Sequence, residues 1–92
     1  MSHRNARLTV HGRRLLVHRV RELGMPVSAL AVASYYADLL DGFVLDRVDA
    51  GDAPAIEALG MAVCITDTIM AGAPERARLA QEVLRFAATL NN

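Results

Sequence analysis

The sequence contains no lysine, only one cysteine and few aromatic residues. Its single cysteine, Cys64, has no partner within the chain, so no internal disulfide framework forms, and we expect a reducing, cytoplasmic location. The aromatic residues are Tyr35, Tyr36, Phe43 and Phe86, and a core must therefore rely on Ala, Val and Leu. No apolar run approaches the roughly 20 residues that a bilayer requires, so we expect no contact with a membrane.

Acidic residues are missing from the first 21 positions. That stretch holds six of the ten arginines and all three histidines, whereas the rest of the chain has ten acids and four arginines. The net charge of zero therefore hides a basic start and an acidic remainder. The basic part can approach phosphate, which the acidic part repels.

Two helices are predicted in the first half of the chain. Leu16, Val20 and Leu23 form a narrow apolar stripe at helical spacing, which predicts a helix over residues 9–23. Ser28 is a suitable N-cap for a second helix over residues 28–40. Ninety-two residues suffice for one small domain, which we divide into a basic helical arm (1–26) and an α/β part (27–92).

The pattern changes after Gly42 to one of short apolar runs. Residues 42–49 and 61–67 read as buried strands, and residues 52–60 between them as a short helix with Asp52 as its N-cap and Pro54 in its first turn. A last helix is predicted over residues 74–90, with an apolar stripe at Leu79, Val83, Phe86 and Leu90.

The predicted fold class is therefore α/β. It comprises a small βαβ unit with two parallel strands, similar to a fragment of a Rossmann-like sheet, together with flanking helices and an N-terminal helical arm. Two parallel strands leave both sheet edges open. We therefore expect either a piece of a larger sheet or a homo-oligomer that forms through the open edges.

Carboxylates follow both predicted strands. Asp46 and Asp49 lie at the end of the first strand and Asp67 at the end of the second. Ligands bind beyond the carboxyl ends of the strands in open parallel sheets, and carboxylate oxygens suit Mg²⁺. The three aspartates are candidate metal ligands. The alternative is that they cap helices and begin turns, which aspartate favours for local hydrogen-bonding reasons.

The arginines of the basic start are candidates for nucleic-acid binding. Arg4, Arg7, Arg13 and Arg14 could neutralise several phosphates. Sequence-specific reading of bases needs a recognition helix, and the predicted second helix has no Arg, Lys, Asn or Gln. This composition favours nonspecific DNA contact over specific recognition.

The opening stretch "MSHRNARLTVHGRRLLVHRVRELGMPVSALA" resembles the helix-turn-helix start of a family of insertion-sequence transposases. The resemblance covers about residues 1–31, and the matching positions are Asn5, Ala6, Leu8, Thr9, Gly12, Arg13, Pro26 and Val27. It ends before the segment that opens the family's recognition helix, and the family's acidic catalytic domain has no counterpart.

The following stretch resembles a different family. "VSALAVASYYADLLDGFVLD", "IEALGM", "TDTIM" and the final "RARLA-EVL-FA" are similar to the C-terminal segment of 2-phospho-L-lactate transferase, over about residues 27–87. The resemblance implies a Rossmann-like enzyme of deazaflavin coenzyme biosynthesis that uses Mg²⁺. It implies transfer of a phospholactyl or phosphoenolpyruvyl group from a guanosine diphosphate donor to a deazaflavin precursor, with release of GMP.

The family's glycine-rich N-terminal strands have no counterpart in the chain, and no catalytic residue of the family can be assigned to it. The leading hypothesis is a truncated transferase-like protein that is inactive alone. The alternatives are a small DNA-associated protein and a homo-oligomeric interaction module.

Overall fold

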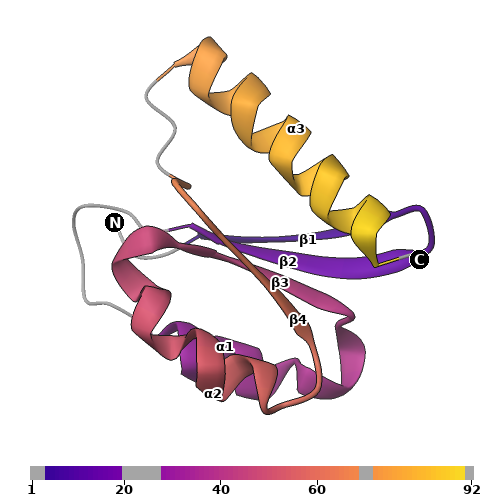
Figure 1. Ribbon diagram of the computed structural model, residues 1–92, viewed down its shortest axis with the longest axis vertical. Coiled ribbons are helices and arrows are strands. Elements are labelled where there is room, and N and C mark those ends of the chain that lie inside the picture. Colours follow the sequence, from indigo (N-terminus) through magenta and orange to yellow (C-terminus); the bar gives the residue numbers. More distant parts are fainter. Residues whose placement is uncertain (1–3, 20–27, 69–71, 91–92) are drawn as a thin grey trace.

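A mixed sheet of four strands forms the centre of the protein (Figure 1). The computed structural model describes residues 4–19, 28–68 and 72–90. The strands lie in the order β1-β2-β3-β4, and their bounds are β1 (Arg4–Val10), β2 (Arg13–Arg19), β3 (Gly42–Asp46) and β4 (Ala62–Thr66). The pairs β2–β3 and β3–β4 are parallel, whereas β1 and β2 are antiparallel.

Residues 4–19 form a β-hairpin, so the helix predicted over residues 9–23 is wrong for its described part, residues 9–19. The helical arm predicted over residues 1–26 is likewise wrong for residues 4–19. Two residues, His11 and Gly12, join the strands, and both have positive φ angles, of 52° and 79°. Positive φ at both central residues is the property of the type I′ turn, whose twist matches that of paired strands. The observed hairpin also excludes the helix-turn-helix geometry that the transposase resemblance implies.

β2 is an interior strand, and its four consecutive residues Leu15, Leu16, Val17 and His18 are all buried. A helix cannot bury four consecutive side chains against one partner surface, but a strand covered on both faces does so directly. His18 packs beside Phe43, with the ring centroids 5.9 Å apart. Burial on both faces is therefore the physical reason for the strand.

The βαβ unit of the second half is confirmed. β3 leads through the 3-10 helix η2 (Arg47–Asp52) and α2 (Ala53–Glu57) into β4, and the two strands pair in parallel. Pro54 lies in the first turn of α2, and Asp52 holds the N-cap position without a side-chain capping bond. The prediction of a fully buried second strand is wrong, because most of β4 is half-buried or exposed at the sheet edge.

The helix expected over residues 28–40 is shorter in the structure. Ser28 caps it as predicted, and its hydroxyl accepts a hydrogen bond from the Ala31 amide at 3.2 Å. α1 (Ala29–Tyr35) then ends, and the 3-10 helix η1 (Ala37–Leu39) connects it to β3. Tyr36 packs on the core, whereas Tyr35 is 81% exposed.

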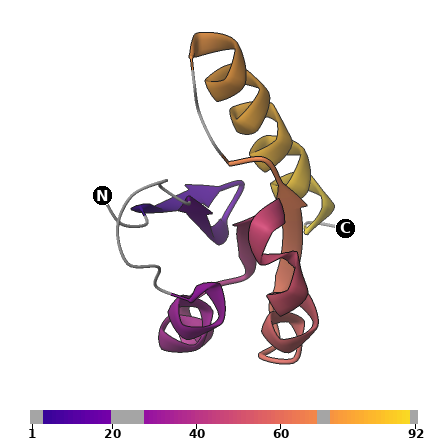
Figure 2. The same ribbon diagram turned by 90° about the vertical axis from the view of Figure 1, so that its left-hand side faces the viewer.

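Helices cover the two faces of the sheet separately. α1 and α2 lie on one face and α3 (Ala73–Thr89) on the other, as both views show (Figures 1 and 2). Below α1 and α2, the core contains Leu16, Ala29, Val32, Ala33, Leu40, Phe43, Leu45, Ala53, Ile56 and Met61. Below α3, it contains Leu15, Val17, Val44, Leu79, Val83 and Ala87. The predicted apolar stripe of the last helix is therefore confirmed.

The α/β class is confirmed, but the sheet has four strands where two were predicted, because the hairpin adds β1 and β2 beside β3. The predicted boundary at residue 26 lies outside the described residues. Among the residues that the structure describes, no helix combines the length and the apolar character needed to cross a membrane.

Candidate functional site at the carboxyl ends of the strands

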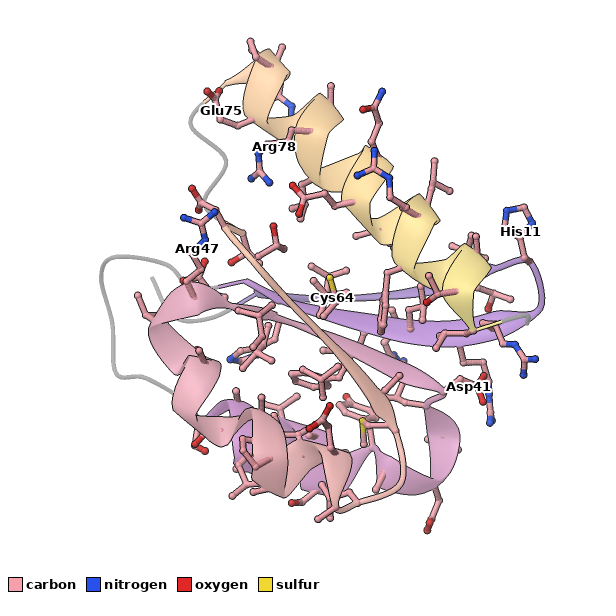
Figure 3. The ribbon with its side chains drawn as sticks, in the orientation of Figure 1. His11, Asp41, Arg47, Cys64, Glu75 and Arg78 are labelled. Atoms are coloured by element: carbon pink, nitrogen blue, oxygen red, sulfur yellow. The ribbon has the colours of Figure 1, made fainter. Side chains whose placement is uncertain are left out.

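The carboxyl ends of β2, β3 and β4 meet at one end of the sheet. Asp46 ends β3 and Thr66 ends β4. Arg47 and Arg78 lie at this end, and Asp41 and His11 lie at the other end (Figure 3). Open α/β sheets bind their ligands outside the carboxyl ends of the strands, so this end is the first candidate for a functional site.

Asp46 is the buried charged group of this end and is 2% exposed. Its Oδ1 atom accepts hydrogen bonds from the amide and the hydroxyl of Thr68, both at 2.8 Å. Its Oδ2 atom accepts one from the Val48 amide at 3.0 Å. Asp46 therefore joins the segment after β4 to the segment after β3.

The pKa of Asp46 reflects these contacts. Burial raises the pKa, but the hydrogen bonds from Val48 and Thr68 outweigh burial and hold it below the usual aspartate value. Three donors aimed at a carboxylate stabilise the charged form. Asp46 is therefore ionised at neutral pH despite its burial.

A second polar network connects α3 to the end of β4. The Thr66 hydroxyl donates a hydrogen bond to Oε1 of Glu82, and the Arg78 guanidinium forms an ion pair with the same carboxylate. Arg78 also donates to the Thr66 hydroxyl at 3.2 Å and to the carbonyl of Asp67. The hydrogen bond from Thr66, with help from Arg78, lowers the pKa of Glu82. This network fixes the first half of α3 to the strand end.

The three predicted metal ligands contribute to this end in different ways. Asp46 caps η2 by accepting a hydrogen bond from the Val48 amide, and capping was the predicted alternative to metal binding. Asp49 lies within η2, and Asp67 directly follows β4. Within residues 4–19, 28–68 and 72–90, no group of three or more His, Cys, Asp or Glu side chains is placed to hold a metal ion. Magnesium binding by these aspartates stays a prediction.

Cys64 faces α3 and is half-buried (Figure 3). Burial, together with the negative charge of Glu82, raises the pKa of its thiol. A raised pKa keeps the sulfur protonated and weakly nucleophilic at neutral pH. Cys64 therefore acts as a packing residue beside the core below α3.

The arginines proposed for nucleic-acid binding lie on the hairpin. The guanidinium of Arg7 lies over the ring of Tyr36, 5.3 Å from its centroid. The backbone amide of Arg14 donates a hydrogen bond to Oδ2 of Asp41 at 2.8 Å. The Nε atom of Arg14 donates to the same oxygen at 3.4 Å. The hydrogen bond from the backbone amide of Arg14 is the main cause of the lowered pKa of Asp41. Both side chains thus have partners within the protein.

A pocket of 340 Å³ lies beside these two arginines, at the opposite end of the sheet from Asp46, and its remaining lining residues are Leu8, Thr9, Leu15, Leu39 and Leu40. Arg13 is half-buried, and the side chain of Arg4 lies outside the described part. DNA binding by this surface stays a prediction.

Sequence reasoning missed two partners at the strand ends. Arg78 and Glu82 come from α3 and reach the site only because that helix docks across the sheet. Their four-residue spacing in the last helix was the available signal, since such a pair faces one side of a helix.

Comparison with known proteins gives a partial match. The chain is 38% identical to the 2-phospho-L-lactate transferase of Methanosarcina barkeri over 65 residues. The aligned region covers 71% of this chain and 21% of that protein. The Methanosarcina mazei protein of the same name is 40% identical over 62 residues, or 67% of this chain and 20% of its own length. The protein of the same name from Methanosarcina acetivorans is 39% identical over 61 residues, which make up 66% of this chain and 20% of that protein.

The chain thus spans about a fifth of the length of the curated relatives that it matches. No protein-family model matches it. No solved structure matches it either. The predicted resemblance to these transferases is confirmed as a partial match, whereas the transposase resemblance of residues 1–31 gains no support from these relatives.

Proposed function

We propose that the chain is a transferase-like α/β unit that corresponds to one part of a 2-phospho-L-lactate transferase and does not transfer a phospholactyl group alone. The observation that carries the proposal is the 38–40% identity to three such enzymes over 61–65 residues. The parallel βαβ arrangement from Gly42 to Thr66 supports it, because transferases of this class are expected to use an α/β sheet.

The proposed lack of independent activity has a structural basis. Both carboxylate oxygens of Asp46 accept hydrogen bonds from within the protein, and Arg78 is paired with Glu82. These groups hold the segments after β3 and β4 and the helix α3 in place at the strand ends. The chain also matches only 20–21% of the relatives' length, which leaves most of such an enzyme to be supplied by other residues.

The finer parts of the proposal follow from the family resemblance. The donor would be a guanosine diphosphate derivative carrying the phospholactyl or phosphoenolpyruvyl group, and the acceptor would be a deazaflavin precursor in the cytoplasm. The resemblance also implies Mg²⁺, which would supply charge neutralisation at the transferred phosphate. Asp46, Asp49 and Asp67 are the candidate ligands at the strand ends, but they are not placed as a group of three, so holding the ion would need further ligands from the rest of such an enzyme.

A transfer assay tests the proposal. The purified chain is incubated with the guanosine diphosphate donor, the deazaflavin precursor and Mg²⁺, and GMP is quantified by chromatography against a blank without protein. We expect no GMP above the blank. Catalytic release of GMP by this chain, reduced by Asp46→Asn, would contradict the proposed inactivity.

The transferase part of the proposal is tested by the remaining segments of a matched relative, such as the Methanosarcina barkeri enzyme. That relative, shortened by the region that aligns with this chain, is co-expressed with the chain. Restored GMP release supports the proposal. A relative that stays inactive with this chain, but is restored by its own missing region, would overturn it.

A further inference from the structure

The outer edge of β4 ends the sheet on one side (Figure 1). Ala62–Thr66 has the sequence AVCIT, with no charged residue, proline or glycine. Natural proteins usually protect an exposed sheet edge with such residues, because its outward N–H and C=O groups would otherwise pair with another strand. β4 lacks these protections.

The opposite edge is different. β1 contains Arg4 and Arg7, and the Arg7 side chain is exposed. Two β1 strands that paired with one another would bring the arginines of both copies together, which opposes association. The two edges are therefore unequal, and only β4 is free of charge.

The side chains of β4 alternate between the two faces of the sheet. Val63 packs against the core below α1 and α2, and Cys64 packs against the core below α3. Ile65 is 46% exposed although it lies in a strand, where a large β-branched residue normally has neighbours on both sides. The apolar neighbour that Ile65 lacks would come from a strand added beside β4.

We propose that this neighbour is β4 of a second copy, paired antiparallel about a two-fold axis at Cys64. In this register Val63 of each copy faces Ile65 of the other, and Ala62 faces Thr66. The same apolar contact therefore forms twice, as a self-complementary interface requires. No charged residue of either strand opposes another, and the result is one continuous sheet of eight strands with α3 of both copies on the same face.

The oligomeric state tests this proposal. We expect sedimentation velocity of the purified chain to show a monomer–dimer equilibrium that shifts toward the dimer as the protein concentration rises. Ile65→Lys should raise the dimer dissociation constant by about tenfold or more, because each lysine would face an apolar partner. The control is Leu8→Lys on β1, a leucine of similar exposure (41%) at the opposite edge of the sheet, and it should leave the constant unchanged.

Cross-linking through Cys64 tests the register. As the only cysteine, Cys64 can form a covalent dimer only if two copies bring position 64 together. We expect copper–phenanthroline at alkaline pH, where the thiol ionises, to give a disulfide-linked dimer in the wild type and none in Ile65→Lys. A monomer at all concentrations would overturn the proposal, as would a dimer that resists Ile65→Lys and gives no Cys64 cross-link. Neither result depends on transferase activity, so the proposed function would stand unchanged.

Discussion

At the scale of single residues, Asp46 shows how one side chain joins two connections of the fold. It is a buried carboxylate with three protein donors, and it lies at the strand end where a metal ligand was predicted. A hydrogen bond to a charged group contributes more than one between neutral groups. Asp46 therefore stabilises the segments after β3 and β4 whether or not it binds an ion.

We expect Asp46→Asn to reduce the free energy of unfolding at pH 7 by about 2 kcal/mol. The substituted amide can still accept from Thr68, but its NH₂ group would face the Val48 amide and leave that donor without an acceptor. Urea unfolding followed by circular dichroism measures the change. Asp38→Asn, at an exposed position of η1, is the control and should change stability by less than about 0.5 kcal/mol.

The same residue predicts a dependence on pH. Because the pKa of Asp46 is lower in the folded protein than in the unfolded chain, its ionised form stabilises the fold above the ordinary aspartate pKa. This stabilisation is lost as pH falls through the lowered value. The stability difference between wild type and Asp46→Asn should therefore shrink between about pH 5 and pH 2. A difference that stays constant over this range would contradict the role of the charge.

At the scale of elements, a substitution of Gly12 in the hairpin turn distinguishes the observed strand pair from the predicted helix. The two conformations respond to it with opposite changes in stability. Gly12 has a φ angle of 79° and open space where a Cβ atom would lie. Gly12→Ala should destabilise the protein by about 1 kcal/mol, because an L-residue is strained in this conformation. In a helix the same change would stabilise by about the same amount.

Thermal unfolding measures the sign of this change. His11→Asn is the companion variant, because Asn tolerates the φ angle of 52° at that position better than His and should preserve or slightly raise the melting temperature. A higher melting temperature for Gly12→Ala would show that residues 9–23 are helical after all.

The docking of α3 depends on the absence of a side chain at Gly42. A Cβ atom there would lie 2.8 Å from Cε2 of Phe86 and 2.9 Å from Cδ2 of Leu15. Gly42→Ala should reduce the free energy of unfolding by about 1–3 kcal/mol through overpacking. Adding Phe86→Leu should recover part of this loss. Gly51→Ala, where nothing lies within 4 Å, is the control, and an equal loss there would contradict the packing explanation.

The sequence predicted the elements whose pattern allows one interpretation. Leu79 and Val83 repeat at helical spacing over a long stretch, and both are buried in α3 as expected. Residues 9–23 allowed two interpretations, because Leu16 and Val20 also fit a helical stripe. The consecutive run from Leu15 to Val17 and the His11–Gly12 turn decide for strands, and tertiary burial on both faces outweighs the local spacing.

The candidate site was predictable in position but not in its contacts. Asp46 was located at a strand end from the chain alone, whereas its partner Thr68 lies 22 residues away and Glu82 reaches Thr66 from another element. Such long-range contacts depend on how α3 and the loop after β4 pack. The helical spacing of α3 indicates which side faces the sheet, but not which strand end it meets.

At the scale of the whole molecule, the sheet unites the basic start of the chain with the acidic remainder. β2 pairs in parallel with β3, from Leu15 opposite Gly42 to His18 opposite Leu45. Both core layers include β2 residues, Leu16 on one face and Leu15 and Val17 on the other. Residues 4–19 are therefore part of the sheet, where the sequence alone favoured a separate arm.

The most direct test of this account is the stability of the chain without residues 1–20. Removal of the hairpin would expose one edge of β3 and leave gaps in both core layers. We expect no cooperative transition for the shortened chain in urea unfolding followed by circular dichroism, and a cooperative transition for the full chain. Cooperative unfolding of the shortened chain, within about 1 kcal/mol of the full chain, would contradict it and support an independent arm.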